Sequence, residues 1–182
     1  MIKEIIQTFL PWLIYFVLSG HTLEQMKVAI VASAIVSLLF ERNGLKKKFI
    51  LSWVTLLFFI FMFVAVVILN SSWVITHAWV LSNSALAFIA WFSILIKRPF
   101  TLQYAKEKVS ADKWDHPIFW RINYLLTISW GVIFLIGVLA NILRLYYKNI
   151  NPWVYELCTN GAVVFGIWFS VWFPSWYAGK KR

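Results

Sequence analysis

The sequence predicts an all-α membrane protein, a bundle of six transmembrane helices with five as the alternative. Of the 182 residues, 62% are hydrophobic and only 13% are charged, whereas a soluble domain is about half apolar and a quarter charged. Apolar runs of about 18 residues or more recur along the chain, long enough to cross a bilayer. We therefore expect a single integral-membrane domain over residues 1–182. The expected spans cover residues 5–19, 23–40, 49–69, 78–96, 118–147 and 153–172.

The first two spans differ in how well they fit a bilayer. The first is short and contains Pro11, which predicts a kink; if it lies along the interface instead, five spans remain. Thr22 precedes the second span in an N-cap position. Within that span, small residues recur every four positions at Ala29, Ser33 and Ser37. This stripe predicts close approach of another helix.

The third and fourth spans follow a basic loop. Residues 41–48 read ERNGLKKK, with Asn43-Gly44 as a turn signal. The third span contains no charge, and an uncharged connection at residues 70–77 leads to the fourth.

The last two spans are separated by Asn151-Pro152. The fifth has 30 residues, about 45 Å of helix, so its ends must project beyond an apolar layer about 30 Å thick. The sixth carries a second stripe of small residues, at Ala162, Gly166 and Ser170. We expect this helix to end near Trp172, with Pro174 at the start of the tail.

The basic residues predict the orientation. Fourteen of the 17 Lys and Arg residues fall on the side that holds both termini, and only Lys27, Arg144 and Lys148 fall on the other. By the positive-inside rule, both termini are cytoplasmic. The net charge of +10 is thus explained by membrane orientation. We expect no nucleic-acid partner, since no base-reading module is present.

The longest polar stretch lies between the fourth and fifth spans, with its loop at residues 97–117. We call residues 97–121 the central polar segment. Leu102, Ala105 and Val109 share a weak amphipathic face, which predicts a short interfacial helix. Contact with lipid headgroups and docking of a protein partner remain open alternatives. The residues expected to make the contact are Lys97, Arg98, Phe100, Lys106, Lys108, Lys113, Trp114 and Arg121.

Ionisable side chains are sparse inside the spans. Glu24, Lys27, Arg144 and Glu156 fall near span ends, where they can pair or snorkel. Four amides are expected to hydrogen-bond between helices, each worth about 0.6–2 kcal/mol: Asn83, Asn123, Asn141 and Asn160. A small-molecule or lipid transporter with a polar midplane site at Asn83, Asn141 and Asn160 is the alternative function.

The remaining polar residues favour no catalytic, cofactor or metal site. His21 and His77 fall on the same predicted outer side, and interfacial roles are favoured over a metal or haem. Asp115 is expected to cap the fifth helix, with Pro117 in its first turn. The single cysteine, Cys158, is expected to be a small buried hydrophobe. We therefore expect a protein that is not an enzyme.

Several short stretches resemble the bacterial intracellular septation protein A family, also called inner membrane-spanning proteins. The similarity follows the order of the spans and covers most of the chain in outline. The stretches are Phe9-Leu10-Pro11, residues 30–36, Arg98-Pro99, Arg121-Ile122-Asn123, residues 130–134 and Leu139-Ala140-Asn141-Ile142.

The resemblance implies a multi-pass protein of the bacterial inner membrane that supports septation, cell elongation and envelope integrity. It implies partners among the inner-membrane proteins of division or elongation, besides membrane lipids, and it implies no catalytic residue. Self-association into a homo-oligomer stays open.

Overall fold

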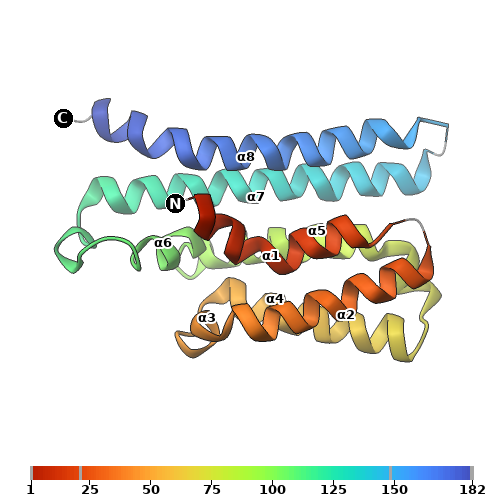
Figure 1. Cartoon of the computed structure of the whole chain (residues 1–182). Coiled ribbons are helices and arrows are strands. Elements are labelled where there is room, and N and C mark those ends of the chain that lie inside the picture. Colours follow the sequence, from red (N-terminus) through yellow and green to blue (C-terminus); the bar gives the residue numbers. More distant parts are fainter. Residues whose placement is uncertain (1, 21, 148, 181–182) are drawn as a thin grey trace. The chain divides into compact units, whose positions relative to one another are not determined.

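Helices are the only regular secondary structure among the residues that the structure describes. The computed structural model describes residues 2–20, 22–147 and 149–180, with side chains from Phe9 onward except that of Pro152. No strand occurs in these ranges, which confirms the predicted all-α class. The helices are shown in Figure 1.

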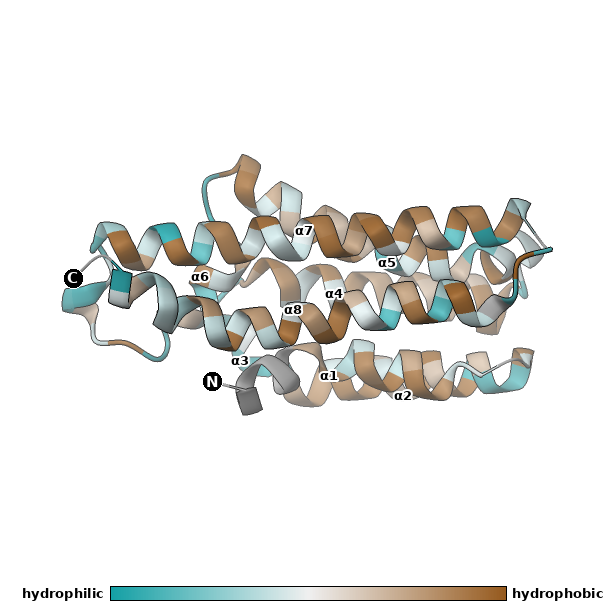
Figure 2. Ribbon diagram, turned by 90° about the horizontal axis from the view of Figure 1, so that it is seen from above, coloured by the Kyte–Doolittle hydropathy of each residue, from teal (hydrophilic) through white to brown (hydrophobic). Residues whose placement is uncertain are grey.

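Five helices are long and apolar enough to cross a membrane, as in a multi-pass membrane protein. These are α2 (Leu23–Phe40), α4 (Ile50–Met62) with its π-helical continuation η1 (Phe63–Ile68), α5 (Ser72–Leu95), α7 (Pro117–Tyr146) and α8 (Pro152–Lys180). The first helix, α1 (Ile2–Leu18), has a described apolar part of only Phe9–Leu18. Hydrophobic residues cover most of the long helices, and polar residues gather at helix ends and connections (Figure 2). The short elements are α3 (Arg42–Lys46), α6 (Phe100–Ala105) and the 3-10 turn η2 (Ala111–Lys113).

The helices divide into two compact units, whose boundary falls within α5. Unit 1 covers Met1–Ala85 and unit 2 covers Leu86–Arg182. Each unit has its own packing, described separately below.

In unit 1, aromatic side chains join α1 to α4. The Trp12 ring stacks on Phe58 with 4.9 Å between centroids, and Tyr15 lies edge-on to Phe59 at 5.7 Å. The indole Nε1 of Trp12 donates a hydrogen bond to Thr55 Oγ1 at 2.8 Å. Because Trp12 is almost fully buried, this bond satisfies a donor that would otherwise be costly to leave unpaired.

The helix α2 packs through its small residues. Ala29, Ser33 and Ser37 are all completely buried, which confirms that this stripe lets neighbouring helices approach closely. Thr22 caps the helix as predicted. Its hydroxyl accepts a hydrogen bond from the backbone N–H of Gln25, and the Gln25 side-chain oxygen accepts one from the Thr22 N–H. This reciprocal pair fixes where α2 begins.

In unit 2, α7 and α8 form an antiparallel hairpin (Figure 1). The Nε1 of Trp130 on α7 donates to Ser170 Oγ on α8 at 3.0 Å. A Cβ added at Gly166 would lie 2.6 Å from Ile133 Cδ1 and 3.1 Å from the Trp130 ring. The second stripe of small residues therefore packs against α7, as the spacing predicts.

Two helices differ from their predicted bounds. α5 begins at Ser72 rather than near Ala78, because the connection contains no helix breaker and Ser71 Oγ accepts from the Val74 N–H. α8 continues to Lys180 with Pro174 inside it. An interior proline removes one backbone donor and crowds the carbonyl four residues earlier, yet the helix persists through Pro174, with the rings of Trp172 and Trp176 stacked at 5.3 Å on either side of it.

The depth of Trp53, Trp91 and Trp130 within their spans predicts that they pack between helices, and Cys158 is predicted to be buried; the prediction is wrong for Trp53 and Cys158. Trp53 is 45% exposed because its Nε1 reaches back to the Leu45 carbonyl near the helix start. Trp91 is 39% exposed but packs its indole from α5 against Gly131 on α7, as predicted. Cys158 is exposed on α8, a helix that buries little of its surface. Trp130, in contrast, is buried as predicted.

Candidate functional site

The central polar segment is anchored to unit 2 rather than hanging free. α5 ends at Leu95, and two residues later the left-handed backbone of Lys97 (φ 58°) reverses the chain. The buried Ser93 hydroxyl then accepts the Phe100 N–H at 3.1 Å and donates to the Ala90 carbonyl. Ser93 thus joins the end of α5 to the first residue of α6.

A second anchor joins α6 to α7. The Thr101 hydroxyl lies 2.7 Å from both the Asn123 carbonyl and the Thr127 hydroxyl. Thr127 is completely buried and also donates to the Asn123 carbonyl at 3.0 Å. Since Phe100 and Leu102 are buried as well, α6 is held by polar and apolar contacts together.

These contacts correct the predicted amphipathic helix. α6 ends at Ala105, so Val109 lies outside it, and Leu102 faces the protein. Phe100 is 2% exposed, which rules out the predicted contact of its ring with lipid or a partner. The physical reason is that α6 is tied to α7 through Thr101, and its apolar side chains Phe100 and Leu102 face the protein interior.

Beyond α6, Trp114 organises the loop. Its Nε1 donates to the carbonyls of Lys106, at 3.2 Å, and Val109, at 3.1 Å. The Lys106 ammonium lies over the same ring, 5.1 Å from its centroid. The indole therefore bridges the end of α6 and the turn before α7, and it holds one cation in place.

The loop and the first turns of α7 form a shallow, open hollow of about 590 Å³ on the surface. It is lined by Lys106, Trp114, Asp115, Pro117, Trp120, Arg121 and Tyr124. The Trp120 and Tyr124 rings are nearly parallel, at 16°, with centroids 5.0 Å apart. The hollow therefore combines two cationic side chains and one carboxylate with flat aromatic walls.

The other predicted contact residues are accessible. Lys97, Arg98, Lys108, Lys113 and Arg121 are exposed, Lys106 is half-buried, and Trp114 is 37% exposed. Phe100 alone among the eight is buried. The segment thus presents its cations outward while its apolar side chains hold it against α7.

One predicted helix cap is wrong. The N-cap of α7 is His116, whose Nδ1 accepts the Ile118 N–H at 3.2 Å, and not Asp115. Pro117 occupies the first turn, as predicted. Because Asp115 is not needed as a cap, its carboxylate is left on the rim of the hollow.

The predicted interhelical amides bond within their own helices. The amide nitrogens of Asn83, Asn123 and Asn141 donate to the carbonyls four residues earlier, at 3.0, 2.8 and 2.8 Å. All three side chains are buried, whereas Asn160 is exposed. The prediction of interhelical bonds is therefore wrong for these donors, since the carbonyl one turn back, which already accepts a backbone N–H, offers a second lone pair within reach of the amide.

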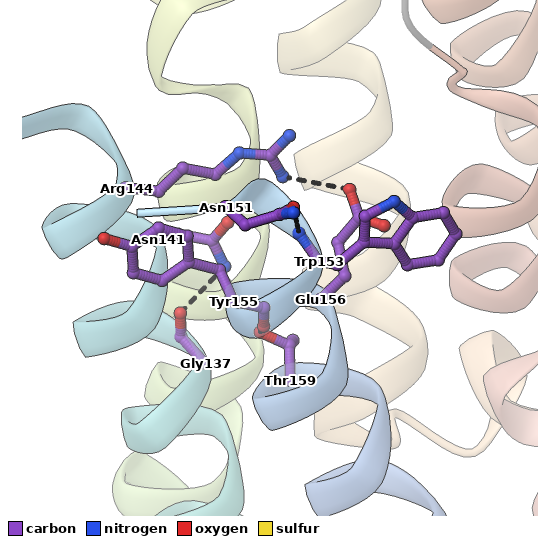
Figure 3. Close-up of polar contacts among 8 residues, drawn as sticks. All are labelled: Gly137, Asn141, Arg144, Asn151, Trp153, Tyr155, Glu156 and Thr159. Carbon is purple, nitrogen blue, oxygen red and sulfur yellow. Dashed lines mark hydrogen bonds and ion pairs between the residues drawn. The ribbon is translucent and has the colours of Figure 1, made fainter. Parts of the chain in front are cut away.

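A polar cluster occupies the turn between α7 and α8, at the opposite end of α7 (Figure 3). Arg144 and Glu156 pair across the hairpin at 3.4 Å. Asn151 caps α8 by accepting the Trp153 N–H, and the Tyr155 hydroxyl donates to the Tyr147 carbonyl at 3.2 Å. The sequence predicts pairing of charges near span ends; Lys27 and Glu24 also pair, at 3.6 Å.

Sequence reasoning missed a buried carboxylate in unit 1. Glu41 is 5% exposed and accepts a hydrogen bond from the Ser52 hydroxyl. Gly44 lies against both: an added Cβ would be 2.1 Å from Ser52 Oγ. The signal available in the sequence was that Glu41 is the sole acid in a basic loop, directly after a span.

No group of three His, Cys, Asp or Glu side chains able to hold a metal ion occurs among the described residues. His21, one of the two histidines weighed for such a site, lies outside them. His77 stacks on Trp73 at 4.5 Å and bonds the Trp73 carbonyl at 2.8 Å. His77 is thus oriented by its own helix.

Comparison with known proteins gives no relative. No family model matches the chain, and no curated protein or solved structure is similar to it.

Proposed function

We propose that this chain is a non-enzymatic factor of the bacterial inner membrane that supports septation, cell elongation and envelope integrity by contacting other membrane proteins. The resemblance of its spans to the intracellular septation protein A family supports this role. The single observation that carries the contact mechanism is the central polar segment, which exposes five cationic side chains. Hydrogen bonds to Ser93 and Asn123 hold this segment in one position. A surface that is already ordered loses little conformational entropy when a partner binds.

The same proposal places the segment in the cytoplasm, together with both termini. Fourteen of 17 basic residues support that orientation by the positive-inside rule. The partner surface is then expected to be acidic, because opposite potentials steer association and fix its register.

The transporter alternative has less support. Its three asparagines differ in environment: Asn83 and Asn141 are buried with their amide nitrogens bonded to their own helices, while Asn160 is exposed. None of them lines the hollow beside Trp114 or a second, apolar hollow beside Phe88 and Leu95.

Crosslinking in cells tests the contact. A photo-reactive residue at Lys108 is expected to capture division or elongation proteins of the inner membrane. Replacing Lys97, Arg98 and Lys113 with Ala removes three exposed cations and should abolish the crosslink. The matched control replaces Arg42, Lys46 and Lys48, three exposed cations of the other basic loop, and should leave the crosslink intact.

The role in division is tested separately by cell length. Cells that lack the protein are expected to have an altered length distribution under the microscope, and the wild-type chain should restore it. If the variant at Lys97, Arg98 and Lys113 restores cell length as well as the wild type, the central polar segment is not the contact surface.

A further inference from the structure

We infer that the hollow beside Trp114 binds one anionic phospholipid through its phosphodiester headgroup. This deepens the proposed function, because it gives part of the central polar segment a lipid ligand and leaves the exposed lysines for a partner. The position of the hollow, its charge and its aromatic walls support the inference independently.

The position follows from the length of α7. Its 30 residues make about 45 Å of helix, while the apolar layer of a bilayer is about 30 Å thick. The first turns of α7, from Pro117, therefore lie at the level of the headgroups. Those turns form one wall of the hollow.

The charge of the hollow matches a monoanion. Lys106 and Arg121 contribute two positive charges and Asp115 one negative charge, so the lining carries a net charge of +1. A guanidinium and an ammonium are the side chains that best bind phosphate oxygens. The Asp115 carboxylate can accept a hydrogen bond from a headgroup hydroxyl, such as those of a glycerol.

The aromatic walls suit the rest of the lipid. Trp120 is 40% exposed, and its ring is nearly parallel to that of Tyr124, one turn further along α7. Flat amphipathic rings of this kind lie at the boundary between headgroups and acyl chains. An acyl chain can therefore run from the hollow along Trp120 and Tyr124 toward the bilayer interior.

The ammonium group of Lys106 is positioned by the Trp114 ring before any ligand binds. Lys106 is positioned over the Trp114 ring, and that ring is fixed by hydrogen bonds to two backbone carbonyls. A cation already placed beside the site loses less rotamer freedom on binding than a free lysine. This distinguishes the hollow from the exposed lysines around it.

The test measures lipid binding by native mass spectrometry of the full chain purified in detergent. Phosphatidylglycerol and phosphatidylcholine with the same acyl chains are the probes, and phosphatidylglycerol is expected to bind more tightly. The Lys106→Ala/Arg121→Ala variant should weaken phosphatidylglycerol binding about tenfold, equivalent to about 1.4 kcal/mol. The Lys106→Arg/Arg121→Lys variant keeps both charges and should retain most of the binding, which separates loss of the site from misfolding.

The matched control is Lys46→Ala/Lys48→Ala, in the basic loop at residues 41–48. It removes the same charge from two exposed lysines outside the lining and should leave binding unchanged. Equal losses in the two Ala variants would show attraction to charge in general and overturn the inference. So would equal binding of the two lipids, or displacement of the lipid by millimolar inorganic phosphate, which would indicate a site for the free ion.

The purified chain contains no partner, so this experiment does not depend on the proposed function. Lipid binding without crosslinks in cells would overturn the proposed contact with partners and leave the lipid site standing. Crosslinks in cells without selective lipid binding would overturn the lipid site and leave the proposed contact with partners standing.

Discussion

At the scale of single residues, the tightest constraints lie where polar groups are buried. Glu41 and Ser52 are joined by a hydrogen bond under the short helix α3, and Gly44 leaves no room beside them. A buried carboxylate is costly unless it is hydrogen-bonded. The glycine is therefore expected to be required for this pairing, since any side chain there would displace the Ser52 hydroxyl.

Gly44→Ala is expected to destabilise the protein. The added Cβ would lie 2.1 Å from Ser52 Oγ and 3.1 Å from the Glu41 carboxylate. Overpacking of this kind costs about 1–3 kcal/mol, which outweighs the gain of about 1 kcal/mol from alanine in a helix. The measurement is the thermal unfolding midpoint of the detergent-purified protein.

Gly161→Ala provides the control, because an added Cβ on α8 meets nothing within 4 Å. This variant should unfold at the same or a higher temperature than the wild type. Equal midpoints for Gly44→Ala and the wild type would show that the pocket around Glu41 can expand without cost.

At the scale of elements, most local features were predictable, apart from the N-cap of α7, and the tertiary contacts were predictable only where a repeat spacing marks one helix face. Thr22 and Pro117 were placed correctly because caps and first turns depend on neighbours in the chain. The small-residue stripes were correct because their spacing sets one helix face. The prediction for α6 was wrong because an apolar face can turn toward lipid or toward protein, and only the fold shows that Phe100 and Leu102 are buried.

The position of the candidate site was predictable from the sequence, but the contacts that hold it were not. Composition alone located the central polar segment and most of its exposed cations. The anchors at Ser93 and Thr101 depend on residues 7 and 26 positions away, which no periodicity reveals. Their hydroxyls also resemble ordinary span residues, so nothing in the sequence singled them out.

The hydrogen bond between Trp130 and Ser170 is expected to couple α7 and α8. A double-mutant cycle of Trp130→Phe and Ser170→Ala should give a coupling free energy of about 0.6–1.7 kcal/mol, the range for hydrogen bonds between helices in membranes. The single variants remove the donor or acceptor of the bond measured at 3.0 Å. The measurement is reversible unfolding in mixed micelles.

The control cycle pairs Trp130→Phe with Ser129→Ala. The Ser129 hydroxyl bonds the Leu125 carbonyl of its own helix, so the two changes should be additive. A coupling free energy near zero in both cycles would mean that α7 and α8 are held by apolar packing alone.

At the scale of the whole molecule, charge asymmetry and helix length together predict the topology. α7 alone connects the central polar segment to the connection that contains residues 149–151, so these two regions must lie on opposite sides if α7 spans the membrane. The positive-inside rule assigns the first to the cytoplasm. Both statements are tested by two positions that flank α7.

Ser110→Cys and Asn149→Cys are therefore expected to label from opposite sides. Both positions are exposed, and Cys158→Ala removes the exposed native thiol. In intact spheroplasts, a membrane-impermeant maleimide should label Asn149→Cys, and it should label Ser110→Cys only after the membrane is permeabilised. Because a bilayer blocks a charged reagent, labelling reports the side directly. The reverse labelling pattern would invert the orientation and place the hollow beside Trp114 outside the cytoplasm. Labelling of both positions from one side would show that α7 does not cross the membrane.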